Sequence, residues 1–371
     1  MKFAVELLPK EEQVMLALRG VFAQSGYARY QMSSFESYDM YLANKSFLKS
    51  GGIITFTDAH GRLKALKPDV TMSIVKNTKE TVTESKLYYI ESVFRTAAHG
   101  SEIREISQMG IEYIGGEGTY AEAEVVRLAT QSLAAISGAY VLDISHMGFV
   151  TALLDRLHPA EETRAAMLAA LRSKNAHTLR ALALQSGCTV AQGETLAALA
   201  TLAGPVAEIL PKAAAMACCD EMHAAVTALQ SLYDTLCAIG IQQKLRLDFS
   251  ITSDVDYYNG LMLQGYVQGV PHAVLAGGRY DNLMRRFGKP QAALGFAVYL
   301  GELGRAFAEK TEYDVDVLLL YTAQQQPALV AKAVAALQAQ GKSVRAAQSA
   351  PPALRAAKIL RMNDDGEVAA C

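Results

Sequence analysis

The amino-acid sequence predicts an α+β fold built around an antiparallel β-sheet, with flanking helices and one long helical insertion. Strand-forming segments lie on both sides of a stretch, residues 149–240, in which alanine and leucine dominate. Two strands, 86–95 and 108–114, are separated by a polar stretch and predict a long antiparallel hairpin. Strands that flank a single run of helices are typical of an α+β fold rather than of a doubly wound parallel sheet.

The elements before the insertion follow from apolar periodicity and from turn residues. Apolar residues at helical spacing predict a helix over 11–24, which a glycine ends soon afterwards. Within 53–66, the segments IITFTD and RLKAL are joined by a His-Gly pair and predict a tight hairpin. An alanine-rich helix and a strand are expected next, at 120–137 and 139–144.

The elements after the insertion complete the sheet and add a short C-terminal unit. Strands are expected at 245–251, 261–268 and 272–276, followed by a strand that leads into a helix within 292–308. A strand, a helix and a strand are then expected at 315–321, 326–340 and 342–347. The predicted domains are a core in two parts, 1–148 and 241–310, the helical insertion at 149–240, and a truncated α/β C-terminal domain at 311–371.

Composition and charge argue against several classes of protein. A formal net charge of -2 gives no basic surface of the kind that neutralises phosphates in nucleic-acid binding. No apolar run reaches the roughly 18 residues of a membrane span, and the N-terminus lacks the apolar stretch of a signal peptide. The five cysteines have no paired metal-binding spacing, which favours reduced thiols in a cytoplasmic protein. No metal is expected, because no metal-ligand spacing supports one, and no nucleotide cofactor is expected, because both usual glycine-rich nucleotide signatures are absent.

Residues that could bind a small ligand gather in five short motifs. These are LKPDVT with Asp69 and Thr71, FR with Arg95, the pair Gln108 and Glu112, DYYNG with Tyr257 and Tyr258, and GGRYD with Gly277 and Gly278. Gln108 and Glu112 are four residues apart, so on a strand they face the same side. Paired glycines allow a backbone to approach a ligand closely. Taken singly, each motif is also compatible with a turn, an exposed sheet face or a core tyrosine.

The order of these motifs resembles that of the histidyl-tRNA synthetases, a family of class II aminoacyl-tRNA synthetases. The resemblance covers about residues 1–310 and implies a class II synthetase-like antiparallel sheet with flanking helices. It further implies that Asp69 and Thr71 hold the ammonium group of histidine and that Tyr257 and Tyr258 flank its imidazole ring. The histidine-binding residues that it implies are Asp69, Thr71, Arg95, Gln108, Glu112, Tyr257, Tyr258, Gly277 and Gly278.

Three positions depart from the family pattern in the residues that activate an amino acid. Arginines of the family align with Glu102, Ser253 and Glu302 in this chain. Activation requires cations beside the phosphate oxygens of ATP, and losing one well-placed donor costs about 3 kcal/mol of transition-state stabilisation. The sequence therefore predicts histidine binding without adenylation, and no catalytic residue.

This combination resembles the non-catalytic branch of the family, the regulatory subunits of ATP phosphoribosyltransferase. The resemblance implies a homodimer that joins short-form catalytic subunits in a hetero-octamer, with histidine as the feedback ligand of the first step of histidine biosynthesis. Binding of tRNA is not expected, because the C-terminal domain is shorter than an anticodon-binding domain. Two alternatives remain: a divergent but active histidyl-tRNA synthetase, and an orphan paralogue that binds another amino acid.

Overall fold

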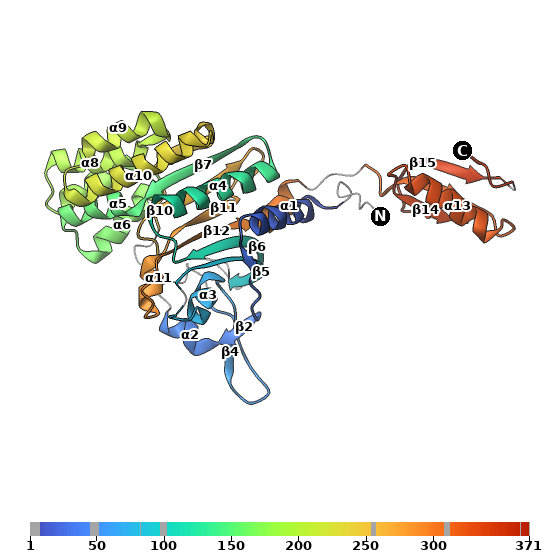
Figure 1. Ribbon diagram of the computed structural model, residues 1–371, viewed down its shortest axis with the longest axis horizontal. Helices are drawn as coiled ribbons and strands as arrows, with labels where there is room; N and C mark the ends of the chain where they lie inside the picture. The colour runs from blue at the N-terminus through green and yellow to red at the C-terminus, as the bar shows by residue number, and fades with distance from the viewer. Residues whose placement is uncertain are drawn as a thin grey trace. The chain divides into compact units, whose positions relative to one another are not determined.

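The computed structural model describes residues 8–44, 52–81, 83–96, 102–253, 257–307, 312–363 and 365–370. The chain divides into two compact units, one spanning Lys10–Ala306 and the other built mainly from the C-terminal residues (Figure 1). Within the described residues, no helix has both the length and the apolar character needed to cross a bilayer. The α+β class predicted from the sequence is confirmed.

A nine-stranded sheet forms the centre of the larger unit in the part of the chain that the structure describes. Its order is β1 (Ala28–Arg29), β5 (Ser85–Thr96), β6 (Ile103–Ile114), β12 (Ala293–Tyr299), β11 (Leu275–Arg279), β10 (Leu261–Val267), β7 (Tyr140–His146), β9 (Leu245–Asp248) and β8 (Ala203–Pro205). The pairs β1–β5 and β7–β9 are parallel, and the other pairs are antiparallel. The predicted central hairpin is therefore confirmed as β5–β6, and its second strand begins five residues earlier than the sequence indicates.

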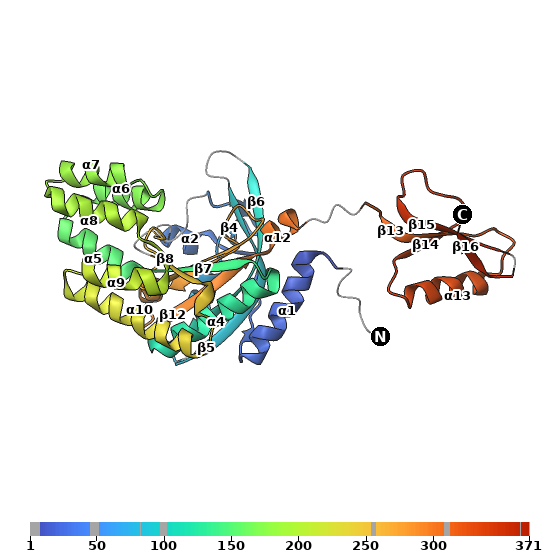
Figure 2. The same cartoon turned by 90° about the horizontal axis from the view of Figure 1, so that it is seen from above.

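The two faces of this sheet have different surroundings. Helices α1 (Lys10–Gln24) and α4 (Gly118–Ile136) lie along one face in both views (Figures 1 and 2). Phe22 of α1 is fully buried there, with its ring centroid 6.1 Å from those of Tyr88 and Phe296. Side chains alternate along a strand, so Gln108 and Glu112 of β6 point to the opposite face.

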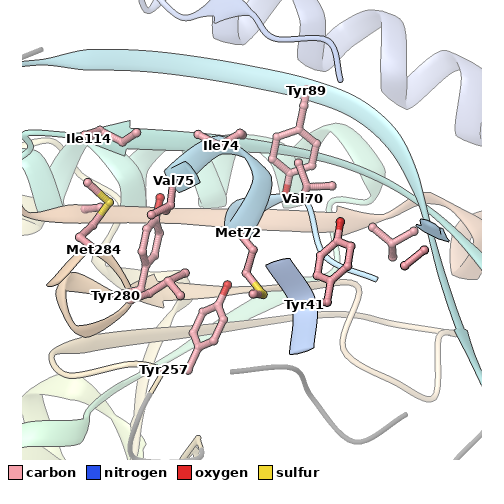
Figure 3. Close-up of a cluster of buried hydrophobic side chains, with 14 residues drawn as sticks. Tyr41, Val70, Met72, Ile74, Val75, Tyr89, Ile114, Tyr257, Tyr280 and Met284 are labelled. Carbon is pink, nitrogen blue, oxygen red and sulfur yellow. The ribbon is translucent and has the colours of Figure 1, made fainter. Parts of the chain in front are cut away.

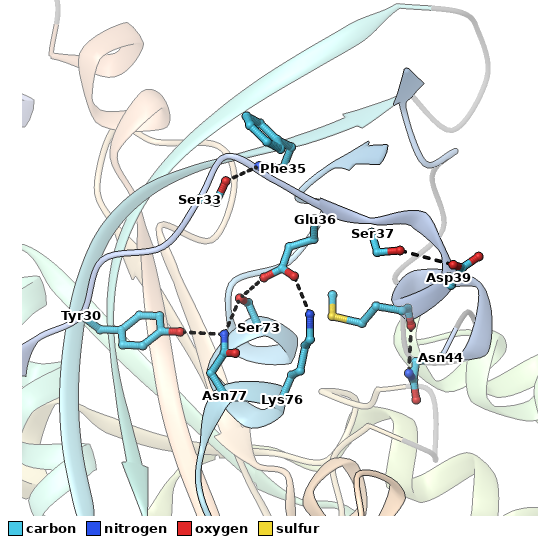
Figure 4. Close-up of polar contacts among 11 residues, drawn as sticks. Tyr30, Ser33, Phe35, Glu36, Ser37, Asp39, Asn44, Ser73, Lys76 and Asn77 are labelled. Atoms are coloured by element: carbon cyan, nitrogen blue, oxygen red, sulfur yellow. Dashed lines mark hydrogen bonds and ion pairs between the residues drawn. The ribbon is translucent and has the colours of Figure 1, made fainter. Parts of the chain in front are cut away.

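A small three-stranded sheet supports a short helix on that opposite face. Its order is β2 (Phe35–Ser37), β4 (Leu63–Leu66) and β3 (Thr55–Thr57), and its neighbours are α2 (Tyr38–Ala43) and α3 (Thr71–Asn77). Glu36 accepts hydrogen bonds from Ser73 at 2.9 Å and from Lys76 at 2.6 Å, and Asn77 donates to the Tyr30 hydroxyl (Figure 4). These bonds fix α3, which begins at Thr71, against the N-terminal segment.

The predicted insertion between β7 and β9 is almost entirely helical. It contains α5 (Met147–Leu157), α6 (Glu161–Arg172), α7 (Ala176–Gln185), α8 (Val190–Thr201), α9 (Val206–Met216), α10 (Asp220–Ala238) and the 3₁₀ turn η3 (Gln242–Lys244), coloured green to yellow in Figure 1. Helix α10 packs against both α5 and α4, so the insertion is joined to the core. The short strand β8, which the sequence does not predict, extends the sheet at β9.

The last elements comprise two short helices of the larger unit and a small C-terminal sheet. The helices are α11 (Asp281–Arg286) and α12 (Leu300–Ala306). The C-terminal sheet has the order β14 (Val344–Ala347), β13 (Val315–Leu320), β15 (Ala356–Met362) and β16 (Val368–Ala370), and α13 (Pro327–Gln338) packs beside it. The core of this unit is centred on Leu319, Val330 and Met362. The strand-helix-strand prediction is confirmed, and β15 and β16 are additional.

Truncation of Phe22 tests the packing of α1 on the sheet. Phe22→Ala should lower the free energy of unfolding by about 3–5 kcal/mol, because it opens a cavity between two aromatic rings. Leu16→Ala is the matched control on the same helix, since Leu16 is 44% exposed, and it should cost less than about 0.5 kcal/mol. Urea unfolding followed by circular dichroism measures both values. Equal losses in the two variants would show that α1 does not pack in this way.

Candidate functional site

A small pocket on one face of the sheet brings together residues from the segments before and after the helical insertion. Its lining includes the sequence-predicted residues Asp69, Thr71, Arg95, Gln108, Glu112, Tyr257 and Tyr258, together with Tyr89, Ala276, Tyr280, Gly295, Phe296, Ala297 and Tyr299. The sequence-predicted residues come from segments as far apart as residues 69 and 258. The fold therefore brings together in space motifs that are distant along the sequence. The floor is formed by β6, β12 and β11.

Glu112 is the most buried charged group of the pocket, with 2% of its surface exposed. Its carboxylate accepts hydrogen bonds from the Thr71 hydroxyl at 2.5 Å and from the Tyr280 hydroxyl at 2.6 Å. Burial raises the pKa of Glu112 to about 8, and the nearby Asp69 adds to this rise, while the two hydroxyl donors oppose it. Glu112 is therefore largely protonated at neutral pH.

The register of the sheet makes room for this carboxylate. Glu112 lies opposite Gly295 on β12, and Gly295 lies opposite Gly278 on β11. A side chain at Gly295 would place its Cβ only 2.2 Å from the Glu112 carboxylate and from a backbone oxygen of β6. The glycine is therefore a steric requirement of the site, which the sequence-based analysis did not identify.

Asp69 and Thr71 are positioned by the start of α3. Asp69 accepts the backbone N–H of Met72 at 2.9 Å, which satisfies one of the open donors of the first helical turn. Arg95 on β5 donates to the carbonyl oxygen of Pro68 at 2.8 Å, and its guanidinium lies 3.8 Å from the Asp69 carboxylate. Arg95 thus holds the LKPDVT segment against the hairpin and contributes a cation at the edge of the pocket.

A buried ion pair behind the pocket was not predicted from the sequence. Lys67 is 1% exposed and its ammonium group pairs with Glu91 of β5. The backbone carbonyl of Lys67 also accepts the N–H of Phe94 at 2.9 Å. Breaking a buried pair by removing one partner is strongly destabilising, so this pair fixes the segment that carries Asp69. In the sequence, the only indication of this pair is Lys67 itself, which lies in the LKPDVT motif. Because lysine side chains are rarely buried, its position does not predict a buried ion pair.

Aromatic side chains close the pocket. The rings of Tyr257 and Tyr258 have centroids 4.6 Å apart, and Tyr257 lies 6.3 Å from Tyr280. Figure 3 shows Tyr257 and Tyr280 in one cluster with Met72 and Tyr89. Burial raises the pKa of four phenols well above 10, namely those of Tyr89, Tyr257, Tyr258 and Tyr280. These side chains therefore act as neutral hydrogen-bonding groups.

The paired glycines of GGRYD do not lie on the pocket lining. Gly277 and Gly278 occupy successive positions on β11 and therefore face opposite sides of the sheet. A Cβ at Gly278 would lie 2.9 Å from the Tyr258 ring, so this glycine makes room for a pocket tyrosine. Arg279 does not reach the pocket either, because its guanidinium binds Glu122 at 2.9 Å and the carbonyl of Gly116.

The three positions at which the resemblance implies a lost arginine lie outside the pocket lining. Glu102 is exposed and forms a surface ion pair with Arg104 at 3.2 Å. Ser253 precedes a gap in the described residues, and Asp256 of the DYYNG motif falls within that gap. Glu302 is half-buried in the first turn of α12. In the part of the chain that the structure describes, the side chains at positions 102, 253 and 302 carry no positive charge.

The charge and volume of the pocket indicate what it can hold. Two acidic side chains, the Asp69 carboxylate and the largely protonated Glu112, face one guanidinium and several neutral phenols, which suits a small zwitterion whose ammonium group favours the ionised form of Glu112. The free volume is about 40 Å³, which is room for a few water molecules only. An amino acid can therefore enter only if side chains around the pocket rearrange. Within the described part of the chain, no group of His, Cys, Asp and Glu residues has the arrangement of a metal site.

The raised pKa of Glu112 predicts a pH-dependent cost to stability. The unfolded chain ionises this carboxyl near 4.5, whereas the folded protein keeps its proton up to about pH 8. The folded state thus binds one more proton in this window, and the free energy of unfolding falls as the pH rises through it. Glu112→Gln has no ionisable group at this position and so avoids this loss of stability. The difference in melting temperature between the variant and wild type should therefore increase, in favour of the variant, from about pH 5 to about pH 8. The control Glu208→Gln, at an exposed glutamate, should show a constant difference. A constant difference for Glu112→Gln as well would contradict the buried carboxyl.

Comparison with known proteins agrees with this geometry. The sequence profile of the histidyl-tRNA synthetase family matches residues 6–303. The ATP phosphoribosyltransferase regulatory subunit of Clostridium kluyveri is 28% identical over 329 residues, which cover 85% of this chain and 83% of that protein. A structure described as an ATP phosphoribosyltransferase regulatory subunit/histidyl-tRNA synthetase from Bacillus halodurans aligns with a TM-score of 0.79 at 21% identity, covering 95% of this chain and 93% of the other.

A third similarity is to a chain of the ATP phosphoribosyl transferase (HisG:HisZ) complex from Thermotoga maritima. It aligns with a TM-score of 0.61 at 16% identity and covers 77% of this chain and 96% of the other. At such identities the structural likenesses establish the fold, which is that of the class II synthetases. Because the family profile matches most of its length, this chain belongs to the histidyl-tRNA synthetase family.

Proposed function

We propose that this chain is a non-catalytic regulatory subunit of ATP phosphoribosyltransferase and that it binds free histidine in the pocket of Glu112. The observation that carries the proposal is a polar pocket lined by Asp69, Thr71, Arg95 and Glu112. The resemblance to the synthetases implies that these side chains bind an amino acid and that arginines of the family are replaced by Glu102, Ser253 and Glu302. The curated relative from Clostridium kluyveri, named a regulatory subunit, supports the same assignment.

The proposed pose assigns each end of histidine to one part of the pocket. The ammonium group contacts Asp69 and Thr71, next to the buried carboxylate of Glu112, and the ligand carboxylate faces Arg95. The remaining pocket residues Gln108, Tyr257 and Tyr258 surround the imidazole ring. Gly277 and Gly278 act indirectly in this pose, because they set the packing of β11 and of Tyr258.

A cationic group of the ligand pairs in the pocket with the Glu112 carboxyl, whose ionisation is disfavoured by burial. The ligand ammonium favours the ionised form of Glu112, so binding releases a proton below about pH 8. This coupling gives the pocket a preference for cationic ligands over neutral molecules of the same shape.

The absence of chemistry in the proposal follows from charge. The transfer of an adenylyl group develops negative charge on phosphate oxygens, which cations must stabilise. Carboxylates at positions 102 and 302 have the opposite sign, and a serine at position 253 has no charge. The site can therefore bind an amino acid but lacks the means to stabilise this transition state.

The proposed partner is a short-form ATP phosphoribosyltransferase catalytic subunit, with this chain as a homodimer inside a hetero-octamer. The Thermotoga maritima complex that shares the fold supports a partner of this kind. We also propose a cytoplasmic location, which suits the free thiols at the described cysteines, and no role in binding tRNA. Feedback then requires that histidine distinguish two states of the assembly.

Two other functions make different predictions. A divergent histidyl-tRNA synthetase would form histidyl-adenylate, and an orphan paralogue would bind an amino acid other than histidine. Calorimetric titration with each of the twenty amino acids separates the second alternative, because the proposal requires histidine to bind most tightly.

The reconstituted complex tests the proposal directly. Co-expression with a short-form catalytic subunit should yield a stable complex whose activity histidine inhibits. Thr71→Val removes the hydroxyl that binds Glu112, so it should raise the histidine concentration for half-inhibition roughly tenfold. Thr201→Val, at an exposed threonine of α8, is the matched control and should leave that concentration unchanged. Failure to form a complex would contradict the partner, and equal inhibition of both variants would contradict the pocket.

A further inference from the structure

A second cavity lies on the same face of the large sheet, over strands that the Glu112 pocket does not use. Its volume is about 560 Å³, which lies within the range of small-molecule sites. The register aligns Gln264 of β10 with Asp143 of β7 and Arg246 of β9, and all three line the cavity. The turn between α6 and α7 closes it from the side of the insertion. The cavity is thus walled by both the sheet and the helical insertion.

Charged side chains from both walls face each other across this cavity. Lys174 of the turn binds the Asp248 carboxylate at 2.7 Å, and Arg246 lies 3.6 Å from the Asp143 carboxylate. Arg172, also in the lining, is a third cation. The described lining therefore carries one more cation than carboxylates. An excess of arginine and lysine over carboxylates in a concave site favours an oxyanion ligand.

Two buried polar atoms of the lining lack hydrogen-bond partners within the described part of the chain. Thr252 is 9% exposed and its hydroxyl has no partner there. Asp143 is 8% exposed, and its oxygen Oδ1 has only the long ion pair to Arg246. Buried polar groups are nearly always satisfied, so such atoms on a cavity wall indicate a polar ligand. A hydroxyl and a carboxylate together suit the hydroxyl groups of a sugar.

The backbone at Lys174 adds a separate indication. Its φ is +55°, in the left-handed region where glycine is the usual residue at the end of a helix. Lys174 follows α6 directly after the capping Ser173 and donates its N–H to Leu171. A lysine occupies a position where glycine would be less strained, and its side chain lines the cavity.

We propose that this cavity binds a small phosphorylated sugar. The phosphate group contacts Lys174 and Arg172 of the α6–α7 turn, and the sugar hydroxyls contact Asp143 and Thr252. Such a ligand would join the helical insertion to the sheet, because its two ends bind different walls. The site is separate from the proposed histidine pocket, and its occupancy does not depend on that pocket.

Calorimetry of the full chain with D-glucose 6-phosphate as the probe tests this site. The wild-type protein should bind it saturably with a Kd below about 1 mM. D-glucose should give no binding, and inorganic phosphate should bind roughly tenfold more weakly, since each lacks one half of the contacts. The same titration with saturating histidine present should give the same Kd, which separates this site from the Glu112 pocket.

Two variants with matched controls make the test decisive. Lys174→Gly should weaken binding at least tenfold; because it also removes the partner of the buried Asp248 carboxylate, its melting temperature should fall, and binding is measured well below that temperature. Thr252→Val should weaken the binding of D-glucose 6-phosphate and leave the affinity for inorganic phosphate unchanged. Lys212→Ala, at an exposed lysine of α9, should bind like wild type. The proposal is overturned if wild type shows no saturable binding, or if Lys174→Gly and Thr252→Val bind as tightly as wild type.

Discussion

The buried carboxyl of Glu112 is the constraint on which the architecture of the pocket depends. It lies on a central strand opposite Gly295, where any side chain would clash with it. The Thr71 hydroxyl of α3 and the Tyr280 hydroxyl, which follows β11, donate hydrogen bonds to it. Burying a carboxyl costs free energy unless it is protonated or paired. The helix, the small sheet and the Lys67–Glu91 pair all serve to keep its hydrogen-bond donors in place.

In the proposed function, the same arrangement lets a synthetase fold act as a sensor. The ligand ammonium pairs with Asp69 and with the ionised form of Glu112, so affinity comes from the pocket itself and needs no phosphate-binding arginines. In this proposal, the loss of those arginines removes the stabilisation of a phosphoryl transition state and leaves ground-state binding intact. The small free volume of the pocket means that side chains around it rearrange when an amino acid binds.

Strand alternation and motif order allowed much of the site to be predicted. The even spacing of Gln108 and Glu112 correctly placed both on one face of β6, and the resemblance to the synthetases, rather than the LKPDVT motif alone, placed Asp69 and Thr71 in the same pocket. The same alternation rule excludes a shared role for Gly277 and Gly278, which face opposite sides of β11. Tyr280 and Gly295 could not be selected, because their importance depends on contact with Glu112 across strands distant in sequence. The strands β15 and β16 escaped prediction because exposed and charged residues interrupt their pattern.

The exchange of pyrophosphate into ATP in the presence of histidine tests the central claim most directly. The purified chain, first shown by calorimetry to bind histidine, is incubated with histidine, ATP, Mg²⁺ and labelled pyrophosphate beside an active histidyl-tRNA synthetase. We expect histidine binding with no exchange above background. Exchange at a rate comparable with that of the synthetase would contradict it, because the charges at positions 102, 253 and 302 would then not prevent adenylation.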